Sequence, residues 1–279
     1  MPANPQIHAT GLPDGRELKM DFLESSFFKN NGPNRCLPMP AEVRALSGTN
    51  QAMPQPLPVI FEHINLIVKF GPHVAIAEAQ CLWVIKRVLC DEVPVPEVYG
   101  WRVDGRDVFI YMQYVRGERL KDRWDSLSIA DKTSVCDQIR EITTSLRQVE
   151  QDPNDSFIGS INRQHLLDIV FEGHPPGGPF ATVKQFNDWF SRLPWLRFPN
   201  SEDIQDPYRT FLPDTGTIKL TMGTYTKATL SSLQQGRHVY MRSLTGPILD
   251  GILIIGNIAK QHILVRLMEN GVIDGSQYF

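Results

Sequence analysis

The chain has 279 residues, of which 42% are hydrophobic and 21% charged, and its formal net charge is −3. This length fits one large domain or two lobes, and the composition excludes a chain that is disordered throughout. The slightly acidic balance argues against a nucleic-acid binder, and the lack of 18 consecutive apolar residues argues against a membrane span.

The first 58 residues are rich in proline and glycine, and two short segments in them are predicted to be helical. These segments are Leu18 to Lys29, and Ala41 to Leu46 directly after Pro40. Residues 53–58 alternate proline with other residues, which favours an extended connector because proline disfavours a helical conformation of the residue before it.

The sequence after this connector has a clearer periodicity. Asn65 to Gly71 is predicted to be a strand, and Ile76 to Leu89 a helix, because its apolar residues recur at helical spacing. Two β-rich runs, Val98 to Val103 and Asp107 to Val115, flank an Asp-Gly pair. That pair, at residues 104–105, predicts a hairpin with a type I′ turn.

After Gly117 the pattern becomes helical. Ile129 to Val149 is predicted to be a long amphipathic helix with Ser128 as its N-cap, and helices are expected to dominate up to about residue 213. A small lobe built on a sheet, followed by a helical lobe, predicts a two-lobed α+β fold.

A lysine and a glutamate in the first lobe point to phosphate binding. Lys69 lies near the end of the predicted strand, and Glu78 follows nine residues later near the start of the next helix. A glutamate that fixes such a lysine lets the ammonium group neutralise the phosphates of a nucleotide. The alternative is a solvated lysine at a sheet edge and a glutamate favoured by the helix dipole.

The second feature is the segment from Tyr111 to Gly117, where a predicted strand runs into a glycine and then a helix. Such a crossing between lobes can offer backbone C=O and N–H groups to the edge of an adenine ring. The alternative is a strand that simply ends at a glycine.

Taken together and in this order, the segments resemble the aminoglycoside phosphotransferase family, a branch of the protein-kinase-like fold, and most closely its fungal subfamily. The resemblance covers about residues 15–221. It is carried by Asp21–Lys29, Leu66–Gly71, Glu78–Trp83, Val93–Gly100, Phe109–Gly117, Phe157–Ile161 and Gly178–Phe180. It implies an N-terminal antiparallel sheet lobe over residues 15–115 and a mainly helical, incomplete C-terminal lobe over residues 116–221.

The resemblance also implies a nucleotide site. Lys69 would be the phosphate-binding lysine and Glu78 its partner. Met112 would lie at the back of the adenine pocket, and Gln113 and Val115 would offer backbone groups of the hinge between the lobes. The family uses ATP and Mg²⁺ to phosphorylate a hydroxyl group of a small molecule, whose identity the sequence does not reveal. No glycine-rich phosphate loop is recognisable before the lysine.

The catalytic residues of the family are missing from this sequence. The family pattern is approximately T-H-G-D-x-H-x-x-N followed by I-D-W. Its first Asp orients the acceptor hydroxyl and takes its proton, and its Asn and second Asp hold magnesium. At the corresponding place Ile218 to Thr229 matches only a threonine and a glycine. The sequence therefore predicts no catalytic residue and no metal ligand.

The genetic code offers a reason for this loss. When the codons of Met222 to Thr229 are read one base earlier, they permit His-Gly-Asp-Leu-His, then Lys, then Ser or Gly, and then Asn. In the same frame, Ser243 to Gly246 permits Ile-Ile-Asp-Trp, and Leu253 to Lys260 permits Pro-Asp-Tyr-Trp-Glu-Tyr-Cys-Lys. A long colinear match in one frame predicts a one-base frame change near Leu220 to Met222. The alternative is a divergent but genuine C-terminal domain.

The composition of the tail agrees with a frame change. The last 65 residues contain no tryptophan and only three of the 31 acidic residues. Residues 222–279 are therefore interpreted as an aberrant, out-of-frame tail, and the kinase-like fold as truncated at its C-terminal end.

Three functional hypotheses remain. The chain is an inactive relative of the phosphotransferases, because the base and both magnesium ligands are absent. Otherwise it is a nucleotide-binding pseudokinase or scaffold protein, or a pseudogene-like product that folds poorly. Four cysteines without a C-x-x-C pair, and a polar start without an apolar core, favour a reduced, cytoplasmic setting.

Overall fold

The structure is a computed structural model that describes residues 5–8, 11–32, 34–48, 56–90, 92–117, 123–167, 171, 173–198, 209–220, 230–234 and 238–241. Its strands are β1 (Gln6–Ile7), β2 (Lys19–Asp21), β3 (Val59–Phe61), β4 (Leu66–Gly71), β5 (Val98–Asp104), β6 (Asp107–Gln113), β7 (Glu150–Gln151), β8 (Leu230–Gln234) and β9 (His238–Met241). Its α-helices are α1 (Ser26–Asn31), α2 (Pro40–Ser47), α3 (Ile76–Val88), α5 (Ile129–Gln148) and α6 (Val183–Arg192). Short 3₁₀ helices cover Glu62–Ile64, Trp124–Ser126, Pro153–Asp155, Leu193–Trp195 and Arg209–Phe211.

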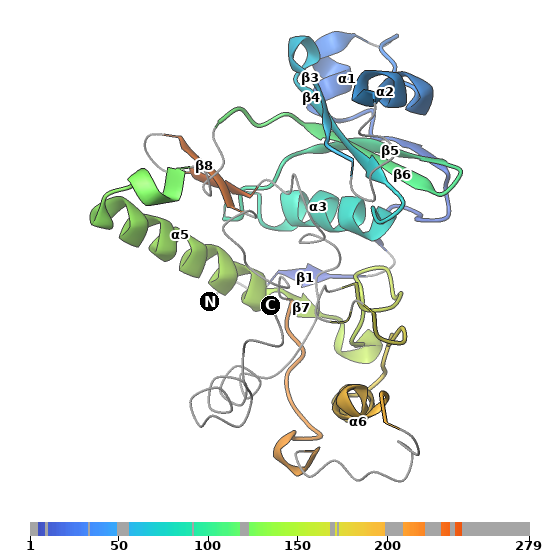
Figure 1. Ribbon diagram of the computed structural model, residues 1–279, viewed down its shortest axis with the longest axis vertical. Helices are drawn as coiled ribbons and strands as arrows, with labels where there is room; N and C mark the ends of the chain where they lie inside the picture. The colour runs from blue at the N-terminus through green and yellow to red at the C-terminus, as the bar shows by residue number, and fades with distance from the viewer. Residues whose placement is uncertain are drawn as a thin grey trace.

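A five-stranded antiparallel sheet organises the first half of the chain. Its strand order is β2-β5-β6-β4-β3. The helix α3 lies on one face of the sheet, and α1 and α2 lie toward the other face (Figure 1). The mixed α+β class is therefore confirmed, with helices on both faces of an antiparallel sheet.

The strand β4 is buried along its whole length because both of its faces are covered. Val68 and Phe70 pack into the core shared with α1 and α2, whereas Ile67 packs into the core shared with α3. Successive side chains of a strand point to opposite faces, so Lys69 faces the α3 side. Both the predicted strand and the helix that follows it are confirmed.

The predicted helix from Leu18 to Lys29 is wrong over its first half. Lys19 to Asp21 form the edge strand β2, which pairs with residues 100–102 of β5, and α1 begins only at Ser26. The pairing requires a glycine, because a Cβ on Gly100 would lie 2.2 Å from the Met20 carbonyl oxygen. The second predicted helix is confirmed as α2.

The predicted hairpin is confirmed, but its turn differs. Asp104 pairs with Asp107, so the two-residue loop is Gly105-Arg106 rather than the Asp-Gly pair. Gly105 has a φ of 66°, and Arg106 is not among the residues with a positive φ. A positive φ at the first loop residue alone is the pattern of a type II′ turn, so the predicted type I′ turn is wrong.

The second half of the molecule is less helical than the sequence predicts. The long helix is confirmed as α5, and its N-cap Ser128 accepts a hydrogen bond from the Asp131 N–H. The described residues between α5 and α6, however, form no α-helix. An isolated bridge between Ile158 and Phe180 holds this irregular segment against the aromatic-rich core around α6.

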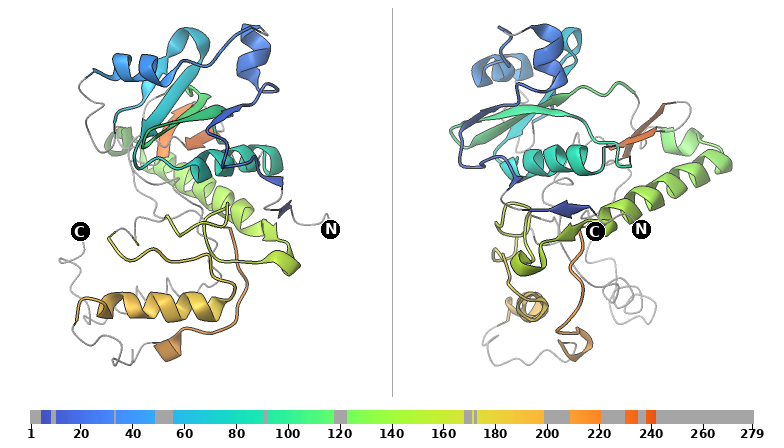
Figure 2. Two further views of the ribbon diagram at one scale, coloured as in Figure 1. Left: turned by 90° about the vertical axis from the view of Figure 1, so that its right-hand side faces the viewer. Right: turned by 180° about the vertical axis from the view of Figure 1, so that it is seen from behind.

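The N-terminal strand β1 joins the two halves. It pairs in parallel with β7, directly after α5, and lies between α3 and that strand (Figures 1 and 2). Ile7 and Leu12 pack against the core beneath the sheet. This pairing of distant segments was not predicted, because a two-residue strand has no periodicity in the sequence.

Of the predicted out-of-frame tail, only β8 and β9 are described, and they pair as an antiparallel hairpin. The expected positions of the catalytic loop (residues 222–229) and of the metal motif (residues 243–246) lie outside the described residues. Leu220, two residues before that loop, packs into the core.

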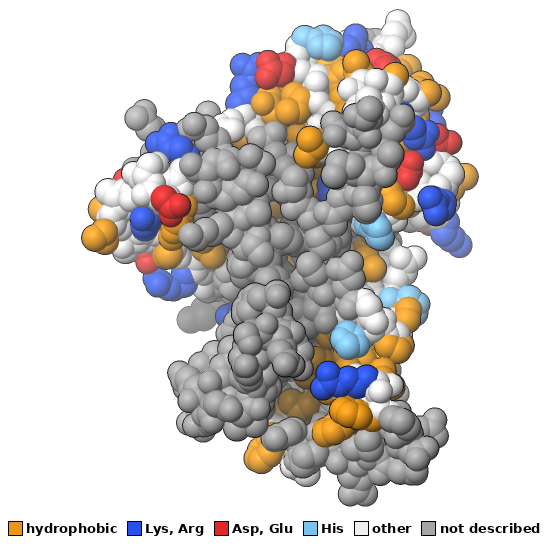
Figure 3. Space-filling view, in the orientation of Figure 1, with side chains coloured by type: hydrophobic (Ala, Val, Ile, Leu, Met, Phe, Trp, Pro, Cys, Tyr) orange, Lys and Arg blue, Asp and Glu red, His pale blue; other side chains and the backbone are white. Residues whose placement is uncertain are grey.

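Charges of both signs are interspersed over the upper part of the face in Figure 3, where the sheet lies, and hydrophobic side chains gather lower down, around α6. The exposed apolar residues that follow α6 are Leu196, Phe198 and Phe211. Within the described part of the chain, no helix is both long enough and apolar enough to cross a bilayer.

Candidate functional site

Lys69 and Glu78 form a closed ion pair between β4 and α3. The Lys69 ammonium donates to both carboxylate oxygens of Glu78, over N–O distances of 2.8 and 2.7 Å. The glutamate has no exposed surface, and the lysine is 8% exposed. The alternative of a solvated lysine at a sheet edge is wrong, because β4 lies between β6 and β3.

The geometry of the pair follows from the strand and the helix. Gly71 ends β4, and α3 begins at Ile76, so Glu78 lies in the first turn of a helix packed under the strand. The Glu78 carboxylate offsets the cost of removing the Lys69 ammonium from water. The ammonium can meet a phosphate group with little reorganisation, because the carboxylate already fixes its position.

Met112 lies on the same face of the sheet as Lys69. Ile67 pairs with Met112 and Lys69 pairs with Ile110 across β4 and β6, and the three apolar residues belong to the core on the α3 side. The structure therefore brings Met112 to within two strand positions of the lysine. Its side chain is 4% exposed.

Gln113 and Val115 lie where β6 ends. The Gln113 N–H donates to the Glu97 carbonyl oxygen at 2.8 Å, and the Tyr114 N–H donates to the Asn65 carbonyl oxygen at 3.1 Å. The Gln113 N–H is thus already bonded within the protein. The Gln113 carbonyl oxygen is the backbone group that could accept a hydrogen bond from a ligand. The Val115 N–H has no hydrogen-bond acceptor among the described residues.

The sequence analysis did not predict a polar contact next to the end of β6, in which Glu97 takes part. Glu97 accepts hydrogen bonds from the backbone N–H and the hydroxyl of Ser26, at the start of α1. The Tyr99 hydroxyl lies nearby, and burial raises the pKa of this phenol above its ordinary value, so it stays protonated. No sequence pattern signals contacts between residues 71 positions apart.

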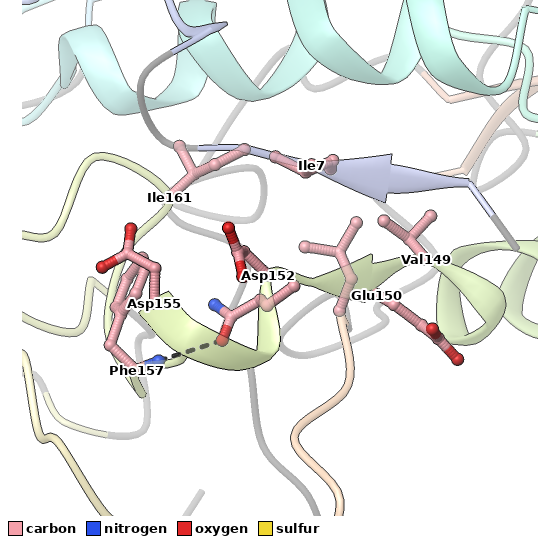
Figure 4. Close-up of a pocket in the computed structure, with 9 residues that line it drawn as sticks. Ile7, Val149, Glu150, Asp152, Asp155, Phe157 and Ile161 are labelled. Atoms are coloured by element: carbon pink, nitrogen blue, oxygen red, sulfur yellow. Dashed lines mark hydrogen bonds between the residues drawn. The ribbon is translucent and has the colours of Figure 1, made fainter.

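A small pocket was also missed, and it shares no residue with the Lys69–Glu78 pair. It lies between β1 and β7, and Figure 4 shows the carboxylates of Asp152 and Asp155 at its rim. Its apolar walls come from Ile7, Val149, Phe157, Ile161 and Leu220.

Each carboxylate of this pocket has a basic neighbour. Asp155 pairs with Arg163, Asp152 lies 3.8 Å from His8, and Glu150 lies 3.9 Å from Lys219. The positive charges of Arg163 and Lys219 therefore lie beside the negative charges of Asp155 and Glu150.

The described residues contain no cluster of three or more His, Cys, Asp or Glu side chains that could hold a metal ion. The chain matches no protein-family model, and no curated protein matches it either.

Proposed function

We propose that the chain is a relative of the aminoglycoside phosphotransferases with a two-lobed, kinase-like fold. Its ancestral activity is ATP-dependent transfer of a phosphoryl group to a hydroxyl of a small molecule. The observation that carries the proposal is the buried, bidentate Lys69–Glu78 pair between an interior strand and the helix packed beneath it.

The other residues of the site support a nucleotide in this place. Met112 lies on the face of the sheet that carries Lys69, in position to border a base next to the phosphates. Gln113 keeps an acceptor and Val115 a donor for the edge of that base. An adjacent acceptor and donor complement the 6-amino group and N1 of adenine.

The residues fit the nucleotide better than they fit magnesium. Lys69 would hold phosphate oxygens, and the nucleotide would supply the phosphoryl group. No described set of carboxylates fits Mg²⁺, and the sequence lacks the His-Gly-Asp and Ile-Asp-Trp motifs. We therefore derive no step through the metal, and we expect the chain with this tail to transfer no phosphoryl group.

A comparison of two coding sequences tests this proposal. One encodes the 279-residue chain unchanged. The other carries the one-base change that restores His-Gly-Asp after Leu220. Both are assayed for ATP consumption with a panel of hydroxyl acceptors. Turnover only in the restored chain supports the proposal, whereas magnesium-dependent turnover by the printed chain, abolished in Lys69→Ala, contradicts it.

The second candidate is a nucleotide-binding pseudokinase or scaffold. The favouring observation is that the ion pair is closed and buried without any of the missing motifs. This candidate requires ATP to raise the melting temperature of the printed chain. A melting temperature unchanged at millimolar ATP counts against it.

A further inference from the structure

A cluster of polar groups lies behind the segment that ends β6. The cluster joins the end of β6 to three other places in the chain, which are the starts of α1, β4 and β5. Its members are Ser26, Asn65, Glu97, Tyr99, Gln113 and Tyr114. We call it the Glu97 cluster.

Glu97 is the centre of the cluster because it bonds in two directions. Its carboxylate accepts the Ser26 N–H at 3.1 Å and the Ser26 hydroxyl at 2.5 Å. Its backbone carbonyl accepts the Gln113 N–H at 2.8 Å, and its own N–H faces the Gln113 side-chain oxygen at 3.4 Å. One residue therefore ties the first turn of α1 to the end of β6.

A second set of contacts in the cluster involves Tyr114, the residue after Gln113. The Tyr114 N–H donates to the Asn65 carbonyl oxygen at 3.1 Å. The Tyr99 hydroxyl lies 3.5 Å from that oxygen and 3.4 Å from the Ser26 hydroxyl oxygen. These two contacts are long and contribute little, so the carboxylate of Glu97 is the main link to α1.

We propose that Glu97 is a positioning residue for base recognition: by anchoring Gln113 to α1, it aims the Gln113 carbonyl and the Val115 N–H at the base. This inference rests on the proposed nucleotide site. An acceptor and a donor in this order suit adenine, whereas the 6-oxo group and N1–H of guanine present the opposite pair. A protein with the cluster intact prefers ATP to GTP, and removal of the carboxylate weakens that preference.

The test measures ATP and GTP affinity by calorimetry on the full chain and on four variants. Glu97→Ala should lower ATP affinity by about ten-fold, the effect of one lost hydrogen bond to a charged group, and bring it close to GTP affinity. Glu97→Gln keeps an oxygen for the Ser26 N–H and should retain most of the preference. Ser26→Ala removes one donor and should have a smaller effect in the same direction.

The control is Asp21→Asn, which breaks the ion pair with Arg102 at the edge strand β2, away from the hinge. It should leave the ATP preference unchanged even if it lowers the melting temperature. Should Glu97→Ala fail to fold, Ser26→Ala decides the question.

The outcomes separate the two proposals. If the wild-type chain binds no nucleotide, the proposed nucleotide site fails, and the role of Glu97 fails with it. If it binds ATP and GTP equally, or if neither Glu97→Ala nor Ser26→Ala reduces its preference, the nucleotide site stands and the role of Glu97 is overturned.

Discussion

Replacing Lys69 with methionine should destabilise the protein strongly, because it leaves a buried carboxylate without its partner. Glu78 has no exposed surface and lies 2.7 Å from the ammonium. At an effective dielectric constant of about 20, two unit charges at that distance attract by about 6 kcal/mol before desolvation is counted. Breaking one side of a buried pair typically costs about 3–5 kcal/mol, a large part of the total stability of a domain.

Urea denaturation of the full chain measures this loss. Lys19→Met is a matched control, because its ammonium lies 3.8 Å from Asp21 with 70% of the side chain exposed, and it should cost less than about 1 kcal/mol. The double variant Lys69→Met, Glu78→Leu removes both charges and should recover most of the lost stability. Equal effects of the two single lysine substitutions would refute the reasoning.

Two further predictions concern the scaffold, and both are measured by urea denaturation. Gly100→Ala should cost about 1–3 kcal/mol or prevent folding, because its Cβ would lie 2.2 Å from the Met20 carbonyl oxygen. Gly105→Ala should lower the free energy of unfolding by only about 1 kcal/mol, because Gly105 has a positive φ but open space around it. A larger loss for Gly105→Ala than for Gly100→Ala would show that the close contact at Gly100 does not require a glycine there. Ser128→Ala should cost about 1 kcal/mol through loss of the α5 N-cap, whereas Ser134→Ala within the same helix should be nearly neutral; equal losses would contradict the capping role.

The elements around the candidate site could be predicted because their signals are local. β4 is an apolar run that ends at Gly71, and α3 repeats its apolar residues at helical spacing. For Lys69 and Glu78 the sequence left two alternatives open, and the structure shows the ion pair. The hairpin strands were predictable from local signals as well, although the turn shifted by one residue because Asp104 pairs with Asp107.

The remaining features depend on contacts between distant parts of the chain. β2 is a three-residue edge strand that forms only because β5 offers Gly100 as a partner without a side chain. β1 has two residues and pairs with β7 far along the chain. The bonds from Glu97 to Ser26 likewise join residues whose proximity arises only after the sheet and α1 pack together.

The most direct test of the central claim is a calorimetric titration of the full chain with ATP, without magnesium, beside its Lys69→Met, Glu78→Leu double variant, which is expected to keep most of its stability. We predict saturable binding by the wild-type chain and at least about a ten-fold loss in the variant, which corresponds to about 1.4 kcal/mol of phosphate attraction. No heat of binding at millimolar ATP, or equal affinity of the two proteins, would contradict the assignment of Lys69 and Glu78 to a nucleotide site.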